Sequence, residues 1–140
     1  MATRYSTIAT RLLAVALLCA MGCHRQASLL HGGTAGTIRL GGMARADLQI
    51  NVFEDGEQSR RRVAYGVSDA QGDFSLIADD GLESAILPPG KYRLTIESVA
   101  AVPIPIPATC RDIQTTKLVQ EWSASDKILA ININESDANR

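Results

Sequence analysis

The residues best placed to bind a cation lie in one short acidic stretch. Asp69, Gln71 and Asp73 put side-chain oxygens at alternate positions, a spacing found in calcium-binding loops. The stretch lacks the remaining ligands and the bidentate glutamate of an EF-hand. Gly72 favours a tight turn instead, with the Asp69 carboxylate capping the backbone. We therefore interpret the stretch as a turn and assign no metal ligand.

Histidine, the usual general base and zinc ligand, occurs only as His24 and His31, close to the N-terminus. A zinc hydrolase needs histidine and carboxylate ligands held together, and a serine or cysteine nucleophile needs an adjacent base. The motifs GxSxG and HExxH and a phosphate-binding glycine loop are absent from the sequence. We expect no catalytic residue and no cofactor. A hydrolase with an unrecognised site is the enzymatic alternative.

Three further features have a structural interpretation beside a functional one. The acidic loop 79–83 is expected to be solvated. Arg60–Arg62 could contact anionic lipid head groups, but we expect this run to face the acidic residues of 54–57 at a strand end. Trp122 could stack on a sugar, but a single tryptophan is expected to pack at a strand end.

The composition argues against nucleic acid as a partner. The chain has 140 residues and a formal net charge of −1. Residues 1–22 carry two arginines and no acidic residue, so the remainder has 12 basic residues against 15 acidic ones, a formal charge of −3. A nucleic-acid footprint needs a clustered basic excess. The length suits one domain after a targeting segment.

Residues 1–22 have the pattern of a secretory signal peptide. Arg4 and Arg11 form a positive region, and a short apolar run follows from Leu12. The run is about ten residues long, half of the roughly 20 that a membrane-spanning helix needs. We expect the protein to be exported.

The end of this segment resembles the lipobox of bacterial lipoproteins. The sequence Leu18-Cys19-Ala20-Met21-Gly22-Cys23 has a small residue before a cysteine, with Ala20 where that family usually has leucine. The resemblance implies that Cys23 is the lipidation site and the N-terminus of the mature chain. Acyl chains would then anchor the protein at a membrane surface. Ordinary signal-peptidase cleavage after Gly22 is the alternative, because Ala20 and Gly22 also fit its small-residue rule.

The cysteine count is consistent with lipidation at Cys23. Cys19 would leave with the signal peptide and Cys23 would be acylated, which leaves Cys110 as a thiol that we expect to be buried. A reactive nucleophile at Cys110 has only the adjacent Arg111 to activate it. A Cys23–Cys110 disulfide is the competing interpretation under ordinary cleavage.

The mature chain reads as a β domain. In Lys91–Glu97, Tyr92, Leu94 and Ile96 alternate with polar residues, which is the period of a half-buried strand. A proline-proline-glycine turn precedes this strand, and the run before Asp69 together with the run after Gly72 predicts a hairpin. The expected strands are seven short runs, at residues 34–40, 47–53, 63–68, 73–76, 91–97, 115–122 and 127–134.

The connections complete this organisation. Val99–Pro107 has prolines at alternate positions, which favours an extended or edge segment. Ile128–Ile133 carries apolar residues on both faces, which suggests a central strand. The spacing predicts an all-β fold, a seven-stranded antiparallel Greek-key sandwich. Residues 23–33 are expected to be a lipidated tether, 34–134 the domain and 135–140 a polar tail.

Three stretches of the domain resemble the carboxypeptidase regulatory-like (transthyretin-like) domain. Within that family, the resemblance is strongest to small predicted lipoproteins of planctomycete-type bacteria. Residues 68–74 match a TDxxGxF hairpin, residues 88–96 match a PPGxYxVxI turn and strand, and residues 115–118 match a TTxL strand. The resemblance covers roughly residues 34–134 and implies a prealbumin-like sandwich. It also implies a folding, adhesion or binding module without catalytic residues.

Together these observations predict a non-enzymatic, lipid-anchored protein of the cell envelope, on its periplasmic or surface face. Its β-sandwich would bind an envelope protein or a glycan, or would serve as a structural module. The alternative is a secreted, soluble subunit of an envelope assembly. In that case Val99–Pro107 or the first strand would add to a neighbour's sheet.

Overall fold

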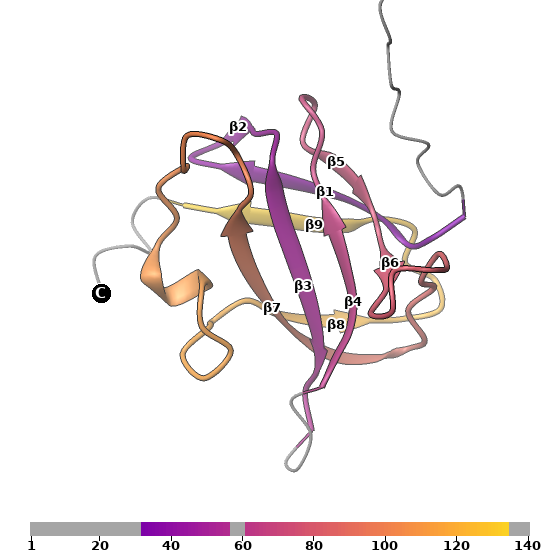
Figure 1. Ribbon diagram of the computed structural model, residues 1–140. Coiled ribbons are helices and arrows are strands. Elements are labelled where there is room, and N and C mark those ends of the chain that lie inside the picture. The colour runs from indigo at the N-terminus through magenta and orange to yellow at the C-terminus, as the bar shows by residue number, and fades with distance from the viewer. Residues whose placement is uncertain (1–31, 57–60, 135–140) are drawn as a thin grey trace, which may run out of the picture.

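The computed structural model describes residues 32–56 and 61–134 (Figure 1). The signal peptide predicted at 1–22, the lipidation site Cys23, the tether up to residue 31, Arg60 and the tail at 135–140 lie outside these residues. Gly32 and Gly33 are the only tether residues inside them.

Two β-sheets pack face to face and form a sandwich (Figure 1). The first sheet contains β1 (Ala35–Leu40), β2 (Met43–Ala44), β5 (Asp73–Ser75) and β9 (Leu129–Ile133). The second has the order β6 (Ile77–Ala78), β4 (Arg62–Val67), β3 (Leu48–Glu54), β7 (Gly90–Ser98) and β8 (Val119–Trp122). A short 3-10 turn, η1 (Ala108–Cys110), follows the proline-rich segment. The all-β, sandwich-like architecture expected from the sequence is confirmed.

The core lies between the two sheets. Strand β9 contributes alternate residues, Leu129, Ile131 and Ile133, which are all buried. Strands β3 and β7 face them with Leu48, Ile50, Val52, Leu94 and Ile96. Burial of each such side chain contributes about 1.5–3 kcal/mol, so the alternation along the strands sets which face turns inward.

The number of strands and their directions differ from the expectation. Nine strands are present in the described residues, not seven, because β2 and β6 are two-residue strands that show no readable alternation. The sheets are not wholly antiparallel either. Strand β9 pairs with β1 in parallel, from Gly36 opposite Leu129 to Leu40 opposite Ile133.

The hairpin predicted between residues 63–68 and 73–76, which form β4 and β5, is wrong. Strand β4 pairs with β3 and β6, while β5 pairs with β1 in the other sheet. The turn between them carries the chain across the core. The local signal was correct for the turn but could not show that Phe74 has to lie opposite Gly36 of β1.

Two other expectations about position are also corrected. Strand β9 is an edge strand of the described sheet, since it pairs only with β1. It is not apolar on both faces, because Ala130 and Asn132 face solvent and Ile128 precedes the strand. Strand β1, proposed as an exposed edge, has neighbours on both sides. Val99–Pro107 is irregular and forms no strand.

Candidate functional site

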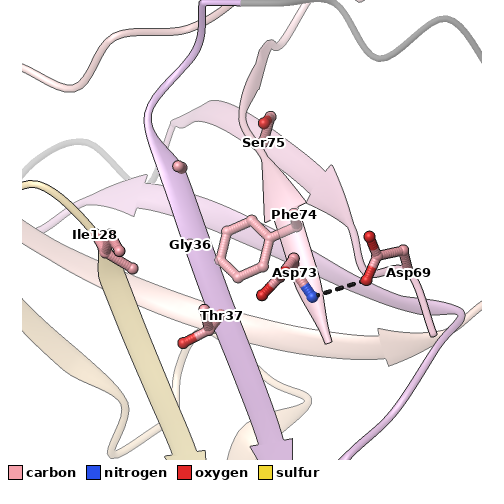
Figure 2. A pocket seen from close by; sticks show the side chains of 8 residues that line it. Gly36, Thr37, Asp69, Asp73, Phe74, Ser75 and Ile128 are labelled. Atoms are coloured by element: carbon pink, nitrogen blue, oxygen red, sulfur yellow. Dashed lines mark hydrogen bonds between the residues drawn. The ribbon is translucent and has the colours of Figure 1, made fainter. Parts of the chain in front are cut away.

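The acidic stretch at Asp69 forms a self-contained turn. The Asp69 carboxylate accepts hydrogen bonds from the backbone N–H of Gln71 (2.9 Å) and of Asp73 (3.0 Å, dashed in Figure 2). Gly72 has a φ of 77°, which a residue without a side chain adopts easily. These contacts confirm the predicted turn. Among the described residues no group of three or more histidine, cysteine or acidic side chains is placed to hold a metal ion.

A shallow cavity of about 260 Å³ lies beside this turn, between β1 and β5. Figure 2 shows that Asp73, Thr37 and Ile128 surround it, with the Phe74 ring beside Gly36. The Asp69 Oδ1 atom already accepts two backbone N–H groups. The Asp73 carboxylate and the hydroxyl groups of Thr37 and Ser75 also line the cavity.

A larger hollow, which we call the distal groove, has a volume of about 600 Å³. It is lined by Leu40, Arg45 and the proline-rich residues 102–108. Val102 is 81% exposed, and the hydroxyl of Ser98 accepts the N–H of Ile104 at 2.9 Å, which holds the segment in place. The groove combines an apolar wall with one guanidinium group.

The backbone next to Arg45 is fixed by Ser68, which is 3% exposed. The Ser68 hydroxyl donates to the carbonyl of Arg45 (2.8 Å) and accepts the N–H of Leu48 (3.1 Å). Between them lies Asp47, whose φ of 59° is a left-handed conformation that is uncommon outside glycine. Its carbonyl accepts the N–H of Val99 at 2.9 Å. No sequence pattern singled out Arg45, because its position depends on contacts between distant segments.

The outer face of the five-stranded sheet carries a polar cluster around Asn51, which is only 2% exposed. Its side-chain N–H groups reach Thr95 (3.3 Å) and Glu97 (3.1 Å). Its oxygen accepts from Gln49 (2.9 Å) and Arg62 (3.1 Å). All of its hydrogen-bonding groups are therefore paired, and the cluster holds β3, β4 and β7 together.

Two groups of the same sheet have displaced pKa values. The Arg93 hydrogen bond to Asp55 (2.6 Å), helped by Lys91 at 3.4 Å, lowers the pKa of the Asp55 carboxyl despite partial desolvation. Burial, with a smaller effect from Glu54, raises the pKa of Tyr92, whose hydroxyl donates to the carbonyl of Pro88. Neither residue lines the two cavities above. Both shifts follow from contacts that hold strand β7.

Three other residues that the sequence singled out, Cys110, Trp122 and Arg62, have structural roles. Cys110 is a buried residue, as expected. Trp122 packs at a strand end, 8% exposed, with its indole N–H donated to Leu87 at 3.0 Å. In the predicted Arg60–Arg62 run, the carbonyl of Arg61 accepts the N–H of Glu54 at 3.4 Å. The Arg62 side chain forms an ion pair with Asp79, and its guanidinium lies 5.1 Å from the ring of Tyr65.

No family model, curated protein or solved structure matches the chain. Within the described part of the chain, no helix has the length and apolar character that crossing a membrane requires.

Proposed function

We propose that this protein is a non-enzymatic module of the cell envelope, anchored by lipid at Cys23, that binds an envelope protein or a glycan through the distal groove. The observation that carries the proposal is the position of the groove relative to the N-terminus. The described chain begins beside Ala35, at one end of β1, and the groove contains Leu40, at the other end. Six strand residues separate these ends by about 17 Å.

The placement of the groove and the first described residues at opposite ends of β1 suits an anchored binding module. A chain held at Cys23 would be attached to the membrane through the end with Gly32, which leaves the groove at the opposite end accessible to other envelope components. Figure 1 shows the proline-rich segment and the first described residues on opposite sides of the sandwich.

The side chains of the groove indicate the chemistry of its partner. Leu40, Val102 and Ile104 offer apolar contact, and Arg45 offers a planar cation that pairs with carboxylate or phosphate. The ionisable group lining this groove is a guanidinium, which is poorly suited to general acid–base catalysis because it stays protonated. We therefore favour binding over hydrolysis.

The resemblance noted in the sequence belongs to the same proposal. We propose a prealbumin-like, Greek-key relation among the seven longer strands, within the carboxypeptidase regulatory-like family. What supports it is the match of residues 68–74 and 88–96 to that family's motifs. In the structure these stretches form the Asp69 turn and the start of β7.

Metabolic labelling with an alkyne fatty acid, followed by intact mass and membrane fractionation, tests the anchor. The wild type should carry the label, begin at Cys23 and sediment with membranes. Cys23→Ser should be unlabelled, while Cys19→Ser should keep the label because residue 19 leaves with the signal peptide. A wild type that is unlabelled and soluble would overturn the proposal.

A secreted subunit of an envelope assembly is the second candidate, and the free edge of β9 favours it. Leu129–Ile133 contains no proline and no charged residue, whereas β2 and β6, at other edges, are only two residues long. A second copy could extend the sheet there. Crosslinking in intact cells should then give dimers that Ala130→Lys abolishes, and monomers at every concentration would exclude it.

A further inference from the structure

At the end of the sandwich where the described chain begins, Thr34 connects the start of the domain to the segment 76–87. Its N–H donates to the carbonyl of Ala85 (2.7 Å), and its hydroxyl accepts the N–H of Leu87 (2.9 Å). Its carbonyl accepts the N–H of Leu76 at 3.0 Å. Thr34 is 8% exposed, so the loop 79–88 and the start of the domain form one rigid unit.

This unit displays large aliphatic side chains to solvent. Leu82 and Ile86 are each 77% exposed, and Ile128, which lies near Ala35, is 57% exposed. Ile86 lines a hollow of about 520 Å³ together with Gly32, Pro88, Pro89 and Trp122. We call Leu82, Ile86 and Ile128 the tether-end patch. Exposed aliphatic side chains gathered at one end of a domain mark an interaction surface.

The length of the preceding chain indicates what covers this patch. Eleven Cα–Cα steps separate Cys23 from Thr34, which span at most about 40 Å when fully extended. Under the proposed lipid anchor, the tether therefore keeps the start of the domain, beside the tether-end patch, within about 40 Å of the bilayer. The distal groove lies at the far end of β1.

We propose that the tether-end patch docks onto the membrane surface, with Leu82 and Ile86 inserted among the lipid head groups, so that the distal groove faces away from the bilayer. The inference rests on the proposed anchoring through Cys23. It adds a fixed orientation to that anchoring, because a lipid chain alone holds the domain without aligning it.

The charges around the patch define the lipid surface that fits it. Asp79 is paired with Arg62, and the Asp80 carboxylate accepts the N–H of Leu82 at 3.0 Å. Glu83 and Lys127 are exposed. Acidic groups on the loop disfavour strongly anionic lipid, so the docking is driven by apolar contact with zwitterionic head groups.

The single tryptophan provides the test, because Trp122 lines the hollow beside Ile86. Purified mature protein is reconstituted in phosphatidylcholine vesicles, with or without bromine on the acyl chains near the head groups. Insertion of Leu82 and Ile86 about 5–10 Å into this boundary would bring the neighbouring Trp122 close to the bromine atoms, which should reduce the wild-type fluorescence about twofold or more.

Two variants separate docking from anchoring. Leu82→Asn with Ile86→Asn should still float with the vesicles but lose most of the quenching. Val102→Asn, which changes an 81% exposed valine in the distal groove and not in the patch, should float and be quenched to the same extent as the wild type. Near-UV circular dichroism checks that each variant is folded.

Three results would overturn the docking while leaving the anchor intact: a wild type that floats without quenching, equal quenching in the double variant, or loss of quenching in Val102→Asn. A wild type that does not float would instead overturn the anchoring, and the docking with it.

Discussion

The ring of Phe74 lies against the backbone of Gly36, in the space that a side chain on residue 36 would need. The two residues are opposite each other on β5 and β1. Strand β5 follows the turn that carries the chain from β4 to the other sheet, and this contact packs β5 against β1 there.

Gly36→Ala should destabilise the fold by about 3 kcal/mol, because a methyl group there overlaps the buried ring and the neighbouring backbone has to shift. Urea denaturation measures the loss. Gly90→Ala is the control, since its new methyl group would meet Tyr92 at ordinary contact distances of 3.5–3.6 Å. The control should change stability by less than about 1 kcal/mol. Equal losses in both variants would contradict the close packing.

Asn51→Ala should cost about 2 kcal/mol, because Thr95 and the Arg62 guanidinium lose a buried partner. Asn51→Asp should cost more at neutral pH, since a carboxylate would face Glu97 in place of an N–H donor. Thermal denaturation compares these variants with Gln49→Ala, which removes only one partner of the cluster. If Gln49→Ala were as damaging as Asn51→Ala, Asn51 would not be the centre of the cluster.

Asp55 should make stability depend on acid pH. Its pKa in the folded protein lies below the ordinary value of 3.8, so the unfolded chain binds the proton more tightly. The stabilisation is present above about 3.8 and is lost as the pH falls through the folded pKa. Asp55→Asn should therefore lower the melting temperature at pH 7 and converge with the wild type in strong acid. Glu83→Gln, in an exposed loop, is the control variant. If the melting temperatures of Asp55→Asn and the wild type differed by the same amount at every pH, the pH dependence would not come from Asp55.

Tyr92 should make the stability of the protein depend on alkaline pH. Burial raises its pKa above 10.0, so the folded protein holds the phenolic proton more tightly than the unfolded chain. Stability should then fall as the pH rises above 10.0 toward the folded pKa. Tyr92→Phe should lose about 1 kcal/mol at neutral pH with the bond to Pro88. Between neutral and alkaline pH, the stability of Tyr92→Phe should fall less than that of Tyr65→Phe. If it fell as much as that of the wild type, Tyr92 would not be the source of the alkaline pH dependence.

The strands and turns of the domain could be read locally. The runs predicted from the sequence overlap the seven longer strands. Apolar alternation marked several of them, among them β3 and β7, because each side chain on a strand points to the opposite face from its neighbour. The Asp69 turn was also readable, since an Asp cap and a glycine with positive φ are properties of four adjacent residues. The expectations at 1–22, Cys23 and 135–140 rest on the sequence alone.

Only the tertiary structure decided which strands pair and which polar groups are buried. The pattern of β5 fits either sheet, and packing of Phe74 against Gly36 placed it beside β1. Asn51 reads as a solvent-facing residue until Arg62, Thr95 and Glu97 close around it. Arg45 joined a groove only when residues 102–108 folded back toward Leu40. Alternation fixes the face that a side chain occupies, but its neighbours come from segments tens of residues away, and their choice depends on the packing of the whole core.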